Sequence, residues 1–446
     1  MMSISINSKN DKTSDTSKVS ATTGSPKWKA FIFPHGSYLI HLPTAHVILT
    51  REDIAQKVLN NETDIPELIA FEAKLPKTVA KELPKIDISA IALNVEESCN
   101  LRCTYCYAGD GNYGKDSSMT LAVAKDILTS LAKGKPRFHI QFFGGEPLLN
   151  FKLIEEIVHW CKTWSETKFT FSITTNGVLL RDQIMDFLKE NKFSVTISYD
   201  GKAIQEAQRK FKNLNTSSNF IRNKIIKYEK DFSQLPSFTI RGTVSNNEVS
   251  KSEAAMFDSL NSFKHSVAIS RASIDKFGNA YNEKDIDTLI QALTSVVEHY
   301  LNLEDFDTIM RIAKIRSFIK ILHFGRLHLN TCTAGLNYLS VSTSGQYFLC
   351  HRFTEDESAK VGNYKNGIDT DKLSQLRNHR MGEQEPCRSC WMRNWCGGGC
   401  YHENQLATGS KTKIDRNFCR IQNAEISLAM KCYTRILQKR PELLEA

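Results

Sequence analysis

The chain has 446 residues, of which 41% are hydrophobic and 24% are charged, a composition typical of a globular protein with a large buried core. Its net charge of +9 is spread along the chain, which argues against a nucleic-acid partner, and the absence of any run of about 18 apolar residues argues against a membrane span. Residues 3–25 lack the apolar core of a signal peptide, so we expect a cytoplasmic protein whose 12 cysteines stay reduced and available for metal or catalytic roles.

The chain begins with polar residues of low complexity at 1–27, for which we expect a disordered tail. Residues 28–84 are expected to form a small α+β module. Within it, the segment from Thr50 to Asp53 resembles a helix N-terminus with acidic residues in the first turn. The module contains short apolar stretches at 30–34, 38–42 and 47–50, followed by a helix-like segment at 51–60.

From residue 85 to residue 325, apolar runs alternate with amphipathic stretches. This alternation predicts an α/β fold with a parallel sheet and right-handed crossovers, as a partial (β/α)6 barrel or as a doubly wound sheet. The expected strands are 88–95, 138–143, 169–174, 194–199, 237–243 and 267–271. The expected helices are 119–132, 150–165, 181–191, 218–231, 249–262, 284–303 and 305–325.

Residues 326–446 have few apolar runs, many turn residues and eight of the cysteines, seven of them between Cys332 and Cys419. Such a composition is expected where metals rather than a hydrophobic core hold the chain together. A helix is expected at the C-terminal end. Cys161 and Cys432 stand apart from the other cysteines in helical segments, and we expect both to be buried, unreactive thiols.

Three cysteines follow the first expected strand of the central region. Cys99, Cys103 and Cys106 have the spacing C-x3-C-x2-C, which lets one loop present three thiolates to a metal cluster. Three ligands leave one iron of a 4Fe–4S cube open for a chelating molecule. A zinc knuckle is the alternative, but it needs a fourth local ligand, and no Cys or His follows within thirty residues.

The sequence Phe143-Gly144-Gly145-Glu146-Pro147 ends the second expected strand. Two glycines allow backbone groups to approach a ligand closely, and a glutamate can accept hydrogen bonds from an ammonium group. These five residues therefore complement the three-cysteine loop.

A second set of cysteines lies near the C-terminus. Its spacing is Cys332-x12-Gly345-x4-Cys350, then C-x2-C-x5-C-x3-C, then a last cysteine. The cysteines after Cys350 are Cys387, Cys390, Cys396, Cys400 and Cys419.

Together these motifs resemble radical S-adenosylmethionine (SAM) enzymes that carry a C-terminal SPASM domain. The resemblance covers residues 86–430 and implies a partial (β/α)6 barrel at 85–325 and a SPASM domain at 326–446. It implies SAM and three 4Fe–4S clusters as cofactors, with the catalytic cluster on Cys99, Cys103 and Cys106. It further implies SAM contacts from Tyr105, Gly144, Gly145, Glu146, Ser198 and Arg209, although the spacing before Arg209 differs by one residue from the family pattern.

In the SPASM family, one auxiliary cluster would be held by Cys387, Cys390, Cys396 and Cys419. The other would take Cys332, Cys350 and Cys400 only, since residues 333–349 contain no cysteine to supply the fourth thiolate found in many relatives. An open iron there could bind a substrate cysteine next to a carbon radical, which is a route to a thioether; water or a side chain filling the site is the alternative.

The motifs look most like maturases of SCIFF peptides and of quinohemoprotein amine dehydrogenase. We therefore expect thioether formation in a ribosomally made precursor peptide, with a leader-binding module resembling a RiPP recognition element at 28–84 and a flavodoxin or ferredoxin as the reducing partner. Anaerobic sulfatase maturation is the first alternative; such relatives carry Asp where this chain has His351. Carbon–carbon crosslinking, epimerisation and a non-catalytic electron carrier are others.

Overall fold

The computed structural model describes residues 27–75, 85–245, 263–271, 281–325, 332–379 and 384–445. The expected tail (apart from Lys27) and the expected helix at 249–262 lie outside these ranges.

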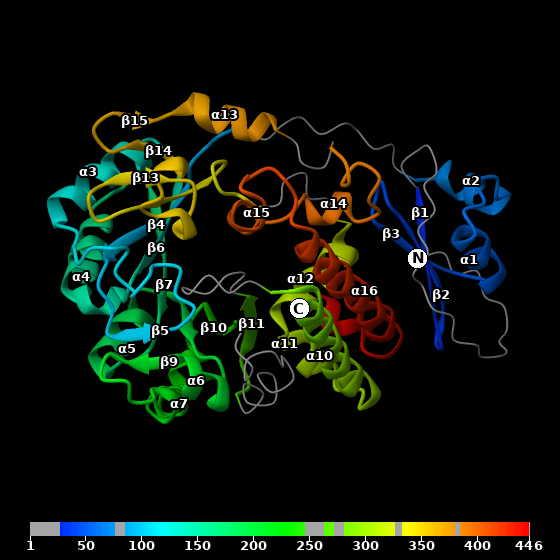
Figure 1. Cartoon of the computed structure of the whole chain (residues 1–446), viewed down its shortest axis with the longest axis horizontal. Helices are drawn as coiled ribbons and strands as arrows, with labels where there is room; N and C mark the ends of the chain where they lie inside the picture. Colours follow the sequence, from blue (N-terminus) through cyan, green and yellow to red (C-terminus); the bar gives the residue numbers. More distant parts are fainter. Residues whose placement is uncertain are drawn as a thin grey trace.

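A sheet forms the centre of the molecule, and its first six strands are those that the alternation predicts. Neighbouring strands are parallel in the order β11-β10-β8-β7-β6-β4, which confirms the expected α/β fold (Figure 1). The six strands are β4 (Ala90–Glu96), β6 (Arg137–Gly144), β7 (Lys168–Thr175), β8 (Ser194–Ser198), β10 (Ser237–Val244) and β11 (Ser266–Arg271).

Helices cover the outer face of this sheet, and the inner face is polar. On β10, Phe238, Ile240 and Val244 are buried, while Thr239 and Arg241 between them keep partial exposure. Since side chains alternate across a strand, the apolar set packs under the helices and the polar set lines the inner face. The flanking helices are α3 (Leu121–Ala132), α4 (Phe151–Cys161), α5 (Asp182–Glu190), α6 (Lys202–Gln208), α7 (Ser218–Lys227) and α8 (Glu229–Phe232).

The helical segment after the sheet differs from the expectation in one respect. In place of a single helix at 305–325, the chain forms α11 (Phe306–Arg311) and α12 (Ala313–Phe324). Ile312 between them is extended and makes a bridge to Val267 of β11, which interrupts the helical hydrogen bonds. The preceding α10 (Glu283–Asn302) begins with a capping box at Asn282, and α10 and α12 both pack against the C-terminal helix α16 (Arg416–Lys439).

The C-terminal region continues the central sheet. Its first strand pairs in parallel with β4, and three further strands follow as an antiparallel meander. These strands are β12 (Tyr338–Val341), β13 (Gln346–Phe348), β14 (Lys360–Asn363) and β15 (Gly367–Ile368), and the helices are α13 (Thr370–Asn378), α14 (Arg393–Cys396) and α15 (Tyr401–Thr408).

The N-terminal module has its own small core and rests on α16. Its strands β1 (Trp28–Phe33), β2 (Gly36–His41) and β3 (His46–Thr50) form an antiparallel sheet, covered by α1 (Glu52–Leu59) and a helix that we did not predict, α2 (Pro66–Glu72). His35 bonds to Thr434 of α16 at 2.8 Å, and Gln438 donates to the Tyr38 hydroxyl at 2.7 Å. In the described sheet β3 pairs on one side only.

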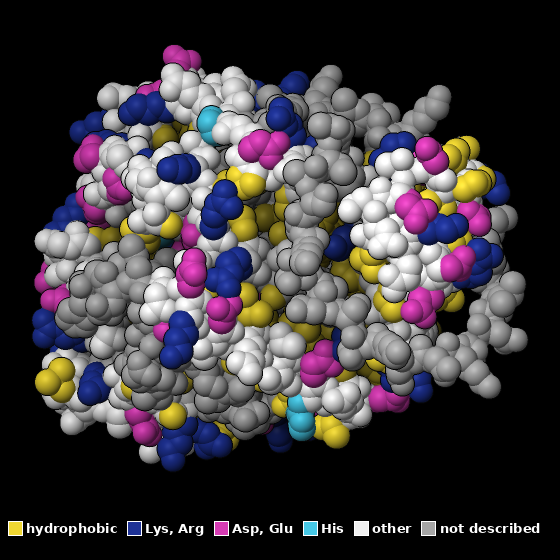
Figure 2. Space-filling view, turned by 45° about the vertical axis from the view of Figure 1, so that its right-hand side comes forward, with side chains coloured by type: hydrophobic (Ala, Val, Ile, Leu, Met, Phe, Trp, Pro, Cys, Tyr) yellow, Lys and Arg dark blue, Asp and Glu magenta, His cyan; other side chains and the backbone are white. Residues whose placement is uncertain are grey.

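Charges of both signs alternate over the face drawn in Figure 2, so no single basic patch gathers the excess positive charge on that face. Among the described helices, none is both long and apolar enough to span a bilayer.

Candidate functional site

The loop that carries Cys99, Cys103 and Cys106 is held by a two-stranded sheet of its own. Strand β5 (Leu101–Cys103) pairs antiparallel with β9 (Arg209–Phe211), which places Cys103 opposite Arg209. The backbone N–H of Thr104 also donates to the carbonyl of Gln208 at 3.0 Å. The pairing explains why the cysteines and a residue a hundred positions away share one site.

The three thiols lie close enough to affect one another. Burial, together with the charges of Glu146 and Cys106, raises the pKa of Cys99 to about 11. Burial raises the pKa of Cys103 to about 12, while Arg209 opposes the shift and Cys106 and Cys99 add to it. Buried thiols that raise one another's pKa need a cation to become thiolates, as the ligands of a metal cluster do.

The two glycines before Glu146 let the three-cysteine loop pack against the sheet. A Cβ on Gly145 would lie 2.3 Å from the carbonyl oxygen of Ser98 and 2.4 Å from that of Gly111. A Cβ on Gly144 would lie 1.9 Å from the carbonyl oxygen of Glu96. In the structure both glycines pack directly against neighbouring backbone, and their expected approach to a ligand stays a prediction.

Glu146 is fully buried, and its carboxylate is already hydrogen-bonded on both oxygens. The Thr175 hydroxyl donates at 2.7 Å, the backbone N–H of Asn176 at 2.7 Å and that of Leu148 at 3.1 Å. Burial raises the pKa of Glu146, and these hydrogen bonds oppose the rise. Such a carboxylate is fixed in position and suited to pair with an ammonium group.

Asn176 connects this carboxylate to the three-cysteine loop. Its side-chain Nδ2 donates to Asn100 Oδ1 at 2.7 Å and lies 3.8 Å from the Cys99 sulfur. The sequence analysis did not predict this role of Asn176, because contacts between residues more than seventy positions apart are invisible in a single sequence.

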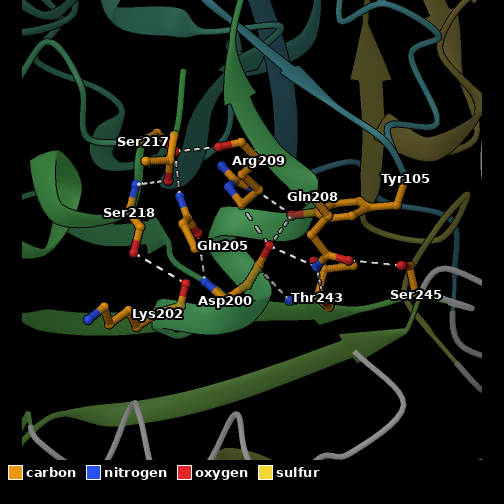
Figure 3. Close-up of polar contacts among 11 residues, drawn as sticks. Tyr105, Asp200, Lys202, Gln205, Gln208, Arg209, Ser217, Ser218, Thr243 and Ser245 are labelled. Carbon is orange, nitrogen blue, oxygen red and sulfur yellow. Dashed lines mark hydrogen bonds and ion pairs between the residues drawn. The ribbon is translucent and has the colours of Figure 1, made fainter. Parts of the chain in front are cut away.

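A buried polar network fixes Tyr105 and Arg209 (Figure 3). Oδ2 of Asp200 accepts from the Tyr105 hydroxyl at 2.9 Å and from Gln208 at 3.0 Å, and Oδ1 accepts from the backbone N–H of Thr243 at 2.8 Å. Arg209 donates to the Tyr105 hydroxyl, and its Nε lies 4.0 Å from Asp200. Burial raises the pKa of Asp200, while Arg209 opposes this rise. Sequence analysis named Tyr105 and Arg209 but not Asp200.

Ser198, the remaining residue expected to contact SAM, ends β8 with a partly exposed side chain on the inner face. The expected SAM-contact residues therefore gather around the carboxyl ends of β6 and β8 and the three-cysteine loop. Beside this loop, a surface cavity of about 250 Å³ is lined by Cys99, Arg102, Asp110, Asn112, Asp116 and Lys212.

The C-terminal cysteines fall into two groups. Burial, with the charges of Cys400 and Cys332, raises the pKa of Cys350 to about 12. The charge of Cys400 also raises the pKa of Cys332. In the other group, burial raises the pKa of Cys419 to about 12, and the charges of Cys396, Cys387 and Cys390 contribute to this rise. The cysteines that raise the pKa of Cys350 are thus different from those that raise the pKa of Cys419. Cys161 and Cys432 are buried apart from both groups, as expected.

Aromatic and basic side chains meet between the three-cysteine loop and the Cys332 group. We call Tyr107, Phe143, Arg241, Tyr338 and His351 the inner-face cluster. The ring of His351 lies 4.8 Å from Phe143 and 6.3 Å from both Tyr107 and Tyr338, and its Nδ1 is 2.9 Å from the Tyr338 hydroxyl. Burial, with help from the charges of Arg241 and Arg352, lowers the pKa of His351 to about 3, so the imidazole is neutral.

Comparison with known proteins finds similarity to one superfamily over part of the chain. Residues 93–225 match the model of the radical SAM superfamily. A radical SAM cyclopropyl synthase, TigE of Paramaledivibacter caminithermalis, is 23% identical over 74% of this chain and 72% of its own length. An uncharacterized protein of Methanocaldococcus jannaschii, MJ0907, is 40% identical, but the match spans only 42% of that protein. A cysteine-type anaerobic sulfatase-maturating enzyme of Clostridium novyi is 29% identical over 31% of this chain and 39% of its own.

Two solved structures share the fold. Native anSMEcpe with bound AdoMet and the Kp18Cys peptide superposes with a TM-score of 0.63, covering 78% of this chain and 99% of that chain at 20% identity. Streptococcus suis SuiB bound to its precursor peptide SuiA superposes with a TM-score of 0.51, covering 89% and 99% at 15% identity.

Proposed function

We propose that the chain is a radical SAM enzyme, in line with the match of residues 93–225, and that it forms a thioether in a ribosomally made, cysteine-containing peptide. The observation that carries the proposal is the arrangement of ten cysteines in three groups, of three, three and four thiols. We propose the partial (β/α)6 barrel as the catalytic core and the region after residue 325 as a SPASM domain.

The thiol groups fit 4Fe–4S clusters better than single metal ions. Within the described ranges, no three or more His, Cys, Asp or Glu side chains surround a position for one ion. A cube binds each thiolate through a different iron, so its ligands stand further apart than those of one zinc ion. We assign Cys99, Cys103 and Cys106 to the SAM cluster, Cys332, Cys350 and Cys400 to one auxiliary cluster, and Cys387, Cys390, Cys396 and Cys419 to the other. When bound, the cluster on Cys99, Cys103 and Cys106 would supply the electron that splits a C–S bond of SAM.

The chain's own residues would orient SAM. Glu146 would accept a hydrogen bond from the ammonium group of SAM, and Arg209 would bind the carboxylate of SAM. The charges of both side chains shift the pKa of Cys99, so both lie near the proposed cluster ligands. Tyr105 would hold Arg209 in place, Ser198 would meet the ribose, and Gly144 and Gly145 would let the loop close over the ligand. The cavity beside Cys99 would bring a flavodoxin or ferredoxin within reach of the cluster.

A peptide substrate is suggested by the peptide-bound structures of anSMEcpe and SuiB. In this chain the N-terminal module offers an edge of β3 that pairs with no described strand, and a leader peptide could add there as a further strand. Recognition by main-chain hydrogen bonds would hold the leader while the modified segment reaches the inner face of the sheet.

Carbon–carbon bond formation is a second candidate, because similarity to the cyclopropyl synthase extends over 74% of this chain. Formylglycine formation is a third, favoured by the sulfatase-maturating relative. Formylglycine formation is disfavoured because this chain has His351 where such relatives carry Asp. The Nδ1 atom of His351 is hydrogen-bonded to the Tyr338 hydroxyl.

One experiment separates these reactions. The reconstituted enzyme is incubated anaerobically with dithionite, SAM and the peptide encoded by a short cysteine-rich reading frame beside its gene, and the product is analysed by mass spectrometry after thiol alkylation. Thioether formation removes one hydrogen from carbon and one from the thiol, so the product loses two hydrogens and resists alkylation. Loss of two hydrogens with an alkylatable cysteine would indicate a carbon–carbon bond, and an aldehyde that reacts with hydrazide would indicate formylglycine. Absence of 5′-deoxyadenosine would refute radical SAM catalysis.

A further inference from the structure

Arg241 is a basic side chain on the inner face of the sheet for which the catalytic assignments leave no role. It lies on β10 between Ile240 and Gly242, which face the helices, and it pairs in register with Ser198 of β8. Its side chain therefore points to the same face as the residues assigned to SAM.

Arg241 lacks a counter-charge in the described part of the chain. Its Nε is shut off from solvent without a hydrogen-bond partner, and no described carboxylate forms an ion pair with it. The two other arginines nearby differ in this respect: Arg209 lies beside Asp200, and Arg352 pairs with Glu403. A guanidinium nitrogen buried without a hydrogen-bond partner is costly, so its retention suggests that an anion completes the site.

The surroundings of Arg241 favour an anion. The guanidinium of Arg352, which pairs with Glu403, lies near Arg241, and the phenols of Tyr107 and Tyr338 can donate hydrogen bonds to an anion there. Burial lowers the pKa of Arg241, as expected for a cation that has lost hydration without gaining an ion pair with a described carboxylate.

SAM does not account for this site. The carboxylate of SAM is assigned to Arg209, the arginine whose charge acts on Cys99, Cys103 and Glu146. The charge of Arg241 instead affects the pKa values of Tyr338 and His351, which lie toward the Cys332 group. The two arginines thus interact with different groups on the inner face.

We propose that Arg241, in the inner-face cluster, binds a carboxylate of the peptide substrate, from an Asp or Glu near the residue that is modified. The guanidinium fork matches a carboxylate in two parallel hydrogen bonds, which fixes orientation as well as charge. Such a contact would position the reacting carbon and make Arg241 a determinant of specificity. This inference rests on the proposed peptide substrate.

The test uses the full chain, reconstituted with clusters and immobilised anaerobically with SAM. It is challenged with an mRNA-displayed peptide library that has one fixed cysteine flanked by random residues. We expect the wild type to enrich Asp or Glu about tenfold at one position near the cysteine, which corresponds to about 1.4 kcal/mol. R241Q should abolish that enrichment. R241K should keep only part of it, since lysine retains the charge but not the fork.

R137Q is the matched control, because Arg137 is an exposed arginine at the opposite end of a strand in the same sheet, and it should enrich acids as the wild type does. Iron content and circular dichroism establish that each variant is folded; if R241Q loses its clusters, R241K decides. Recovery of peptides with no acidic preference, or with an equal preference in the Arg241 variants, overturns the role of Arg241 alone. Recovery no better than on beads without enzyme overturns the peptide substrate as well.

Discussion

Replacing Asp200 by Asn tests whether the buried network around Arg209 holds the site together. Asn keeps the size of Asp and one acceptor oxygen, but its amide would face the donor groups of Tyr105 and Gln208. The change also leaves Arg209 buried without a carboxylate. Removing one partner of a buried ion pair typically costs about 3–5 kcal/mol, and the 4.0 Å separation from Arg209 places this case at the lower end, about 3 kcal/mol.

For a domain of this size, about 3 kcal/mol corresponds to a fall of roughly 6–12 °C in the melting temperature. The assay is anaerobic thermal unfolding of the reconstituted enzyme, followed by calorimetric titration with SAM, whose affinity should fall about tenfold as Arg209 loses its orientation. D182N is the control: Asp182 is exposed and pairs with Lys227, and surface pairs contribute about 1 kcal/mol or less. If D200N melts with D182N and binds SAM like the wild type, the network does not position Arg209.

Three further outcomes are expected. Replacing Cys99, Cys103 and Cys106 together by Ala should remove about four of about twelve iron atoms and abolish SAM cleavage, and iron analysis showing all three clusters intact would contradict the assignment. G145A should displace the three-cysteine loop and lower iron content, whereas G134A, whose Cβ meets nothing within 4 Å, should keep it; equal iron in both would disprove the packing role. His35 has a pKa lowered from 6.5 to about 4, chiefly by burial, so the unfolded chain binds the proton more readily and stability falls as the pH drops from 7 toward 4. Between pH 7 and pH 5, H35Q should therefore lose about 1–2 kcal/mol less stability than the wild type, and equal losses in melting experiments would show that His35 is not responsible.

Much of the fold and part of the site follow from the sequence. The features that follow depend on local sequence patterns, and those that do not depend on contacts between distant residues. The six strands are predictable because their apolar runs alternate with helical patterns, and the three-cysteine loop because its ligand spacing is local. The grouping of the C-terminal cysteines is what the family resemblance implies. The break at Ile312 is not predictable, since it depends on a bridge to Val267 forty-five residues away. Asp200, Asn176 and Arg241 were missed for the same reason: each acts through partners that only the folded sheet brings near. The packing role of Gly145 likewise depends on the carbonyls of Ser98 and Gly111.

Strand β12 is hydrogen-bonded directly to β4, so the segment that carries Cys350 and the strand that leads to Cys99 belong to one continuous sheet. A sheet of this kind resists changes in the distance between points along it, unlike two domains joined by a flexible hinge. If both ends act on one peptide, the span between them is constant, and any adjustment must come from the peptide. Substrates would then be selected by the number of residues between their two reacting positions. Peptides with the right chemistry but a shorter or longer intervening segment would fail to react.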